Sequence, residues 1–255
     1  MPLNAISEML NETGKITRFT ARFFHELFKP RIELAEFLRQ CYFIGYLSVA
    51  LVTITAFIMG LVITMQSRPT LVEFGAEAWL PKMVSVSLIR EIAPVITALI
   101  CSGKIGSGIG AELGSMKVTE QIDAMEVSGT NPFKYLVVTR VLATTLMVPL
   151  LAIFADAVSL YGGYLGTNLG GTVSWDLYWD QVFETLQFRD FLPAVVKTFF
   201  FGFAIGIIGC YKGFNSKKGT EGVGQSANSA VVIASLLVFI LDLLAVQIAT
   251  LFGLT

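Results

Sequence analysis

Long stretches without a charged residue constrain this chain more than any other feature. The first reaches from Gln40 to Ser67, which is long enough to cross about 30 Å of hydrocarbon at about 1.5 Å per residue. Only 15% of all residues are charged, against about 25% in soluble domains, and the mean hydropathy is +0.69. These runs predict an all-α integral membrane protein, because helices satisfy their own backbone hydrogen bonds in lipid.

Five apolar segments qualify as membrane-spanning helices. We expect the spans at residues 42–65, 83–102, 137–160, 191–211 and 227–251. The glycine-rich residues 157–173 either lengthen the third span or form a re-entrant piece. The chain then consists of an N-terminal region, 1–41, and a membrane domain, 42–255.

The N-terminal region predicts an amphipathic helix over residues 3–29. Its apolar face comprises Ile16, Phe19, Phe23 and Leu27. Its basic face comprises Lys15, Arg18, Arg22 and Lys29. A helix with these two faces suits the surface of an anionic leaflet. An ordinary amphipathic helix packed on protein would show the same pattern.

A charge-rich segment separates the second and third spans. Its middle, about 115–128, predicts a short helix with Val118, Ile122 and Met125 on one face. Three acids repeat every three residues on another face: Glu120, Asp123 and Glu126. Ser128-Gly129 supplies a C-terminal stop. A helix of this kind, held in water between two spans, is suited to binding a soluble partner, and a merely solvated loop helix is the alternative.

The distribution of Lys and Arg predicts the orientation. Residues 1–41, 103–140 and 212–226 hold thirteen of them, and the alternate loops, 66–82 and 157–190, hold three. This asymmetry predicts a cytoplasmic N-terminus, a periplasmic C-terminus and a cytoplasmic helix between the second and third spans.

Glycines recur every four residues in two stretches, a spacing that lets membrane helices pack closely. The glycines expected to form helix contacts are Gly106, Gly110, Gly114, Gly162, Gly166 and Gly170. Such contacts would form within the chain or between two copies of it.

Charged residues within the spans are candidate functional sites, because an ionisable group costs a few kcal/mol at bilayer depth. Arg90 and Glu91 are adjacent and would line a cavity for a lipid head group, or else form an interhelical ion pair that fixes packing. Asp156 and Asp242 are expected near span ends as interfacial or capping residues. Lys197 is expected to extend to the external surface.

No pattern for chemistry on this chain is found. The segment GKIGSGIG has Ala98 and Ile105 where a P-loop needs glycine and Ser/Thr, so no nucleotide site is expected. Cys41, Cys101 and Cys210 are isolated, and the single His has no second ligand, so we predict no catalytic residue, no metal site and no bound cofactor. A net charge of -1 argues against nucleic acid.

Three segments together resemble the MlaE/YrbE permeases, the membrane subunits of ABC transporters associated with MCE proteins. They are LIREIAPVITALICSGKIGSGIGAELG (88–114), GSMKVTEQIDAMEVSGTNPFKYLVVTRVLA (114–143) and, more loosely, GCYKGFNSKKGTEGVGQSAN (209–228). The resemblance covers roughly residues 40–252. It departs at Thr139, where relatives often have proline, a difference that concerns the start of the third helix.

The resemblance implies a homodimeric permease in the bacterial inner membrane, with an interfacial N-terminal helix, five spans and a cytoplasmic coupling helix. It implies an MlaF-like cytoplasmic ATPase that uses ATP and Mg²⁺, an MlaD-like MCE-domain hexamer, and in some systems an MlaB-like STAS-domain protein. The cargo would be phospholipid or a related lipid, which links the system to outer-membrane lipid asymmetry. By position, Arg90 and Glu91 match a pair beside the lipid cavity. The residues that match the ATPase-coupling segment are Glu112, Lys117, Glu120, Gln121, Asp123 and Glu126.

Other functions remain as alternatives at this stage. An ion-gradient-driven secondary transporter or channel would use Asp156 and Asp242 as proton carriers, although no inverted repeat is visible. A non-transporting scaffold for an ATPase would not need Arg90 and Glu91. An intramembrane enzyme finds no support in the motifs.

Overall fold

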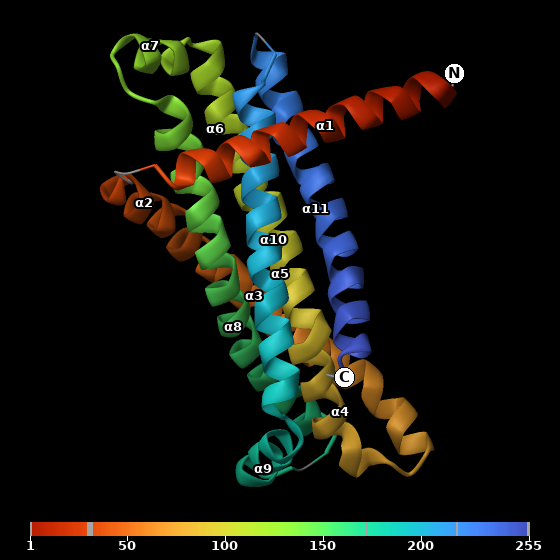
Figure 1. Ribbon diagram of the computed structural model, residues 1–255. Coiled ribbons are helices and arrows are strands. Elements are labelled where there is room, and N and C mark those ends of the chain that lie inside the picture. Colours follow the sequence, from red (N-terminus) through yellow and green to blue (C-terminus); the bar gives the residue numbers. More distant parts are fainter. Residues whose placement is uncertain (1, 30–32, 172, 218, 254–255) are drawn as a thin grey trace. The chain divides into compact units, whose positions relative to one another are not determined.

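The computed structural model describes residues 2–29, 33–171, 173–217 and 219–253, with side chains from residue 10 onward. Every regular element in these ranges is a helix (Figure 1). Five helical segments are long and apolar enough to cross a membrane, which confirms the predicted number. They cover Leu34–Glu73, Glu77–Val118, Phe133–Asn168, Phe188–Phe214 and Thr220–Leu251.

Several of these segments are chains of shorter elements joined without a break. The N-terminal helix is α1 (Pro2–Leu27). The first span comprises α2 (Leu34–Cys41), η1 (Tyr42–Tyr46) and α3 (Leu47–Glu73). The second span comprises η2 (Glu77–Trp79), α4 (Leu80–Ser87), η3 (Leu88–Ile92), α5 (Ala93–Cys101), η4 (Ser102–Gly106) and α6 (Ser107–Val118). The remaining elements are α7 (Gln121–Val127), η5 (Phe133–Val138), α8 (Thr139–Asn168), α9 (Trp175–Thr185), α10 (Phe188–Phe214) and α11 (Thr220–Leu251).

The chain forms two compact units, each assembled from separate stretches of sequence. The first unit comprises Met1–Ile44, Ser102–Thr144 and Phe203–Ser235. The second unit comprises Gly45–Cys101, Thr145–Gly202 and Leu236–Thr255. Each unit has its own packing.

The helices are longer than the apolar runs that predict them. The second span continues through the glycine-rich stretch 102–114 to Val118, where the sequence suggests an approach loop. A glycine costs a helix about 1 kcal/mol relative to alanine, whereas an unpaired backbone group in hydrocarbon costs several. The hydrogen-bonding demand therefore outweighs glycine's low helix propensity.

Four elements, η1, η3, η4 and η5, are π-helical turns. The turn η3 lies directly before Pro94, which has no N–H to give to the helix ladder. A π-turn is one of the ways in which a helix accommodates such a break, and π-turns are frequent at functional sites. Arg90 and Glu91 both lie on η3.

In the first unit, α1 runs crosswise over the helices instead of along them (Figure 1). Its apolar face packs on protein: Phe23 is 2% exposed, and the ring of Phe19 lies 4.9 Å from that of Phe133. Yet Phe24 on the same helix and Phe28 directly after it remain exposed. The helix thus combines packing on protein with an apolar surface left open to its surroundings.

The second unit has a core in which α4 packs against α9 and α8. Its buried members are Leu80, Val84, Leu88, Ile89, Leu160, Tyr178 and Val182. The Tyr178 hydroxyl donates to the carbonyl oxygen of Leu160 at 3.0 Å. Burial raises the pKa of Tyr178 above its ordinary range, so the side chain stays a neutral donor.

The glycine-rich residues after 157 continue helix α8, and a further helix, α9, follows them. Helix α8 continues to Asn168, so the glycine-rich stretch lengthens the span and does not re-enter the membrane. The sequence analysis misses α9, although Ser174 stands directly before it. The hydroxyl of Ser174 accepts a hydrogen bond from the backbone N–H of Leu177 at 3.3 Å, the pattern of an N-cap.

The expected packing glycines fall into two groups. In the second unit, a Cβ on Gly162 would meet the backbone of Phe57, and one on Gly166 would lie 2.9 Å from the Cβ of Thr64. In the first unit, Gly110 closely approaches α11, whose Ala227 Cα would be 3.2 Å from its Cβ. Gly114 would meet Ser216 at 3.4 Å, an ordinary contact.

Gly106 and Gly170 make contacts of other kinds. A Cβ on Gly106 would only touch a methyl group of Ile205 at 3.8 Å, but the carbonyl oxygen of Gly106 would lie 3.2 Å from a Cβ on Gly209 of α10. A Cβ on Gly170 would meet the flexible end of Arg68. Helix-to-helix backbone contact also occurs at Gly60, which packs against the carbonyl of Ser159 and lies outside the glycine repeats.

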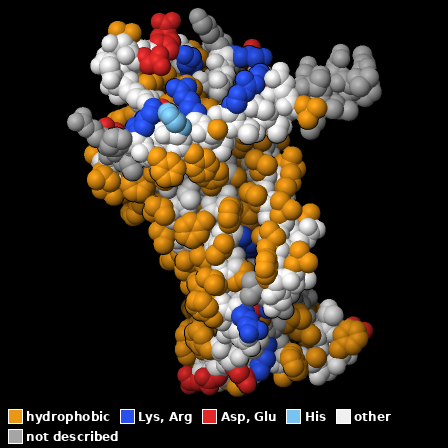
Figure 2. Space-filling view, in the orientation of Figure 1, with side chains coloured by type: hydrophobic (Ala, Val, Ile, Leu, Met, Phe, Trp, Pro, Cys, Tyr) orange, Lys and Arg blue, Asp and Glu red, His pale blue; other side chains and the backbone are white. Residues whose placement is uncertain are grey.

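The surface of the spans is strongly apolar, as Figure 2 shows for one face. Helix α11 is the extreme case: only 17% of its most apolar window is buried. Its exposed side chains include Leu236, Phe239, Ile240, Leu243 and Leu244. Such a surface is normal against lipid or a second membrane subunit and would not be stable in water.

Replacing Gly162 tests the close contact between α8 and α3. Gly162→Ala places a methyl group against the Phe57 carbonyl, so the two helices must separate, and we expect a loss of about 1–3 kcal/mol of stability. Thermal unfolding of the purified protein in detergent measures the effect. The control is Gly108→Ala, where a Cβ meets nothing within 4 Å and stability should hold or rise slightly. Equal behaviour of the two variants would contradict the packing.

Candidate functional site

Arg90 and Glu91 each have an ionic partner on another span of the second unit. The Nε of Arg90 donates to Oδ1 of Asp190, at the start of α10, at 2.6 Å. The other carboxylate oxygen of Asp190 accepts from the backbone N–H of Gln187 at 2.8 Å, and this aspartate is only 5% exposed. Arg90 is therefore held by a carboxylate that is itself fixed.

Glu91 belongs to a cluster centred on Lys197. The ammonium of Lys197 lies 2.6 Å from Glu91 Oε2 and 2.8 Å from Asp242 Oδ1 on α11, the latter an ion pair without hydrogen-bond geometry. The Lys197 side chain is 5% exposed. One cation thus joins three spans and contacts both carboxylates.

This cluster corrects the expectation that Lys197 extends to the external surface. Helix α10 begins at Phe188, so Lys197 lies nine residues, or about 14 Å, along the helix. That distance exceeds the reach of a lysine side chain, and two carboxylates are nearer. Asp242 is likewise neither interfacial nor a cap, because α11 continues for nine residues beyond it.

Asp156 also departs from its expected place near a span end. It lies inside α8, which continues to Asn168, and it is 5% exposed. One of its carboxylate oxygens has no hydrogen-bond partner among the described residues. A buried, unpaired polar atom is unfavourable and marks a place where a further group is needed.

A small cavity adjoins this charge network. Arg90, Glu91, Asp190 and Lys197 form its polar side, and α11 supplies an apolar wall that includes Ala245. Its volume is about 50 Å³. This volume is well below the roughly 300–1,000 Å³ of small-molecule sites, so the cavity alone does not enclose a lipid head group.

The predicted coupling helix consists of two helices instead of one. Helix α6 ends at Val118 and α7 covers Gln121–Val127, with Glu120 between them in the left-handed conformation (φ 58°). This is the one non-glycine residue with positive φ in the described part of the chain. Strain of this kind persists only where the surroundings impose it, and here it folds α7 back on α6.

The sharp turn explains which side chains are presented. Ile122 is 2% exposed, and Asp123 pairs with Lys117 of α6 at 2.8 Å. The exposed side chains on this segment include Glu120, Gln121, Glu126 and Val127. The predicted C-terminal stop is confirmed: Gly129 has φ 79°, and its N–H binds the carbonyl of Glu126 at 3.0 Å.

Val127, the last residue of α7, is 90% exposed. Met125, which the sequence places on the inner face, is half-buried. Helix α7 therefore presents acids and one apolar residue together, a combination suited to docking a protein.

Glu112 has a partner within the chain that the sequence analysis misses. It accepts from Arg140 at 2.8 Å and 3.3 Å, and Arg140 also donates to the carbonyl oxygen of Leu136 at 3.0 Å. Arg140 is only 1% exposed. In the sequence it counts merely as one positive charge of a loop, yet it ties α6 to the start of α8.

Helix α1 is joined to the same loop. Glu26 is 6% exposed and accepts from Lys29 at 2.6 Å and from the side-chain amide of Asn131 at 2.9 Å. The hydrogen bond from Lys29, with a smaller contribution from Asn131, holds the pKa of Glu26 below its usual range. An ionised Glu26 thus connects the end of α1 to the segment that follows α7.

No group of three His, Cys, Asp or Glu side chains is placed as metal ligands within the described ranges.

Comparisons with known proteins place these features in context. The family described as Permease MlaE matches residues 37–248. A probable ABC transporter permease protein of Rickettsia typhi is 39% identical over 222 residues, which cover 87% of this chain and 86% of the relative. One from a Synechocystis strain is 36% identical over 221 residues, with 87% and 84% covered. The intermembrane phospholipid transport system permease protein MlaE of Haemophilus influenzae is 32% identical over 224 residues, with 86% and 85% covered.

Removing the central cation tests the charge network. Lys197→Met leaves Glu91 and Asp242 without a counter-ion, and we expect a loss of about 3 kcal/mol, the low end for a buried pair because Glu91 is half-exposed. Thermal unfolding in detergent measures it. The variant that also carries Glu91→Gln and Asp242→Asn removes all three charges and should regain most of the loss. A triple variant no more stable than the single one would contradict the network.

Proposed function

Because the chain belongs to the MlaE permease family, we propose that it moves phospholipid, or a related lipid, between the inner membrane and an MCE-domain protein on the external side. Family membership makes it a multi-pass inner-membrane permease subunit of an ABC transporter. Such subunits are not enzymes, and ATP hydrolysis belongs to a separate ATPase. The family match over most of the chain carries the proposal.

The lipid cargo is supported by the Haemophilus relative, whose name specifies phospholipid transport. The charge network supplies matching chemistry. A phospholipid head group carries an anionic phosphate, and Arg90 can offer it a fork of N–H donors at the edge of an apolar surface. Arg90 is 35% exposed, whereas its partner Asp190 is buried, so the guanidinium is the accessible member of the pair.

A second copy of the chain would provide the missing volume. The apolar wall of the 50 Å³ cavity comes from α11, the most exposed span of the described chain. A homodimer that packs near α11 would extend this wall and enclose a larger space beside Arg90 and Glu91. The same wall would receive the acyl chains of the lipid.

Coupling to the ATPase would begin at α7. Val127 and the surrounding acids dock on the partner, and force passes through two ion pairs, Lys117–Asp123 and Glu112–Arg140, into α6 and α8. The Lys and Arg asymmetry supports a cytoplasmic position for this segment, with the N-terminus cytoplasmic and the C-terminus periplasmic. The MCE hexamer would then lie on the external side, and a STAS-domain protein would bind the ATPase where one is present.

The partners of Arg90 allow a test that separates lipid binding from packing. Arg90→Gln should reduce the lipid recovered by mass spectrometry from the complex purified with its ATPase by about tenfold, a typical value for a charge-assisted contact. Asp190→Asn releases Arg90 from its ion pair and should preserve or raise lipid recovery. The double variant should behave as Arg90→Gln does.

A purely structural ion pair gives the opposite pattern. Both single variants would then destabilise the protein to a similar degree, and the double variant would restore both stability and lipid recovery. That result would overturn the head-group role of Arg90 and favour a scaffold.

The docking segment is tested by changing side chains that contact little within the chain. Glu126→Lys combined with Val127→Asp should lower co-purification of the ATPase at least about tenfold, as loss of an interface hot spot does. Thermal unfolding should be unchanged because both residues are exposed. The control is Glu184→Lys on α9, an exposed acid whose ion pair is with Lys82. Wild-type recovery of the ATPase with the double variant would exclude α7 as the docking site.

A further inference from the structure

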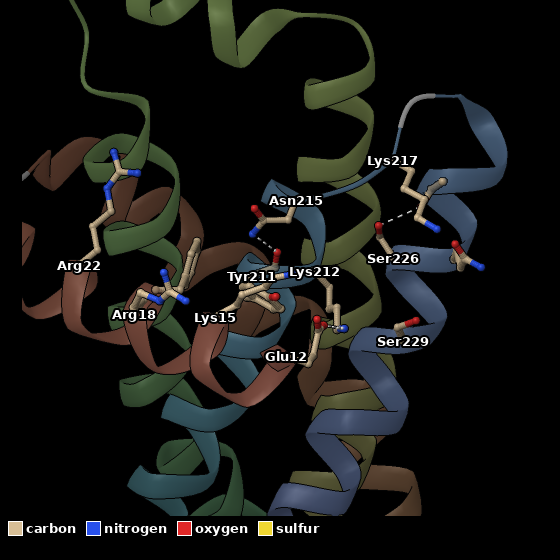
Figure 3. A pocket seen from close by; sticks show the side chains of 13 residues that line it. Glu12, Lys15, Arg18, Arg22, Tyr211, Lys212, Asn215, Lys217, Ser226 and Ser229 are labelled. Atoms are coloured by element: carbon tan, nitrogen blue, oxygen red, sulfur yellow. Dashed lines mark hydrogen bonds and ion pairs between the residues drawn. The ribbon is translucent and has the colours of Figure 1, made fainter. Parts of the chain in front are cut away.

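A cavity in the first unit lies between α1, the end of α10 and the start of α11. Its volume is about 680 Å³, within the range of small-molecule sites. Figure 3 shows side chains from these three helices arranged around it. The cavity is separate from the charge network of the second unit.

Its lining carries an excess of positive charge. Lys15, Arg18, Arg22 and Lys217 form no ion pair with any described residue. One acid, Glu12, belongs to the lining, and it pairs with Lys212 at 2.5 Å. Five cations therefore face a single carboxylate.

That carboxylate is committed to its partner. The hydrogen bond from Lys212 holds the pKa of Glu12 below its usual range, so Glu12 stays ionised at neutral pH. It neutralises Lys212 and also attracts Lys15, and the guanidinium of Arg22 lies 4.3 Å from the centre of the Phe133 ring. Arg18 and Lys217 are left without a comparable partner among the described residues. A concave surface with such a charge attracts anions strongly.

The wall opposite α1 adds hydrogen-bonding groups. Ser226 and Ser229 line the cavity from the first turns of α11. Helix α11 begins at Thr220, so these two serines lie in its second and third turns. On the α1 side, the ring of Phe19 lies 5.5 Å from that of Tyr211 and gives the cavity an apolar edge.

We propose that this cavity binds the phosphate of an anionic lipid head group from the leaflet that contacts α1. Lipid is favoured over a soluble anion because two membrane spans, α10 and α11, bound the cavity. Helix α1 also exposes Leu10 and Phe24, and Phe28 directly after it is exposed too; these side chains can enter the acyl region beside a bound head group. The bound lipid would hold α1 against the ends of α10 and α11. This site needs neither the proposed cargo nor the proposed direction of transport.

Native mass spectrometry of the full chain in detergent, titrated with phosphatidylglycerol or phosphatidylcholine, tests the proposal. Phosphatidylglycerol should bind the wild-type protein about tenfold more tightly or better. Arg18→Gln and Lys217→Gln should each weaken it about fivefold, because each removes one cation near the phosphate. The control Lys104→Gln removes the same charge from an exposed position outside the lining and should have less than a twofold effect.

A second variant distinguishes a built cavity from a diffuse basic surface. Ser229→Phe fills space while it leaves every charge in place, and it should weaken phosphatidylglycerol binding as much as Arg18→Gln does. An unfolding temperature close to that of the wild type shows that Ser229→Phe is folded. If Ser229→Phe does not fold, the test uses Ser229→Leu in its place. Unchanged binding by the folded variant would overturn the cavity site.

Three further outcomes would also overturn the proposal. Equal affinity for the two lipids would remove the requirement for an anionic head group. Inorganic phosphate that displaces phosphatidylglycerol at equal concentration would show a site for soluble anions. Retained lipid binding together with lost ATPase co-purification in the Arg18 and Lys217 variants would show that the cavity docks a protein.

Discussion

The buried ammonium of Lys197 is the interaction on which the second unit depends most. It brings Glu91 and Asp242 together and so joins the second, fourth and fifth spans at one point. In an apolar medium, none of these three charges is tolerable alone. The network therefore constrains how the spans can move, because any motion that separates them must supply another counter-charge.

The membrane spans were predictable because hydrocarbon imposes one rule on every residue of a span. An apolar run of sufficient length has to be helical, so the number of spans follows from sequence alone. The stop at Gly129 follows separately, because glycine readily adopts positive φ. Helix lengths were not predictable in the same way. Charged and glycine residues suggest an end at about residue 102, but the helix continues to Val118, since backbone hydrogen bonding is cooperative and local composition only biases it.

Within the sites, the sequence identified the residues but not their partners. Arg90 and Glu91 stand out because they are charges inside an apolar run, and the alternative of an interhelical ion pair was open from the start. Asp190 and Lys197 lie about one hundred residues away, so their pairing depends on tertiary structure that no local pattern encodes. The role of Arg140 also depends on tertiary structure. Its position in the sequence assigns its charge to a loop, whereas its side chain is buried against Glu112.

One continuous helical segment, Glu77–Val118, carries both the charge network and the ion pairs that lead to α7. The segment ends two residues before Glu120, which has the strained left-handed conformation. Arg90 and Glu91 lie on a π-turn within it. A regular α-helix would move as a rigid rod, so its internal hydrogen bonds would stay unchanged when one end is displaced. A segment interrupted by π-turns at η3 and η4 can instead change its local hydrogen bonding where it bends. In the coupling that we propose, displacement at α7 would rearrange the ion pairs around Arg90, while ATP hydrolysis belongs to the separate ATPase.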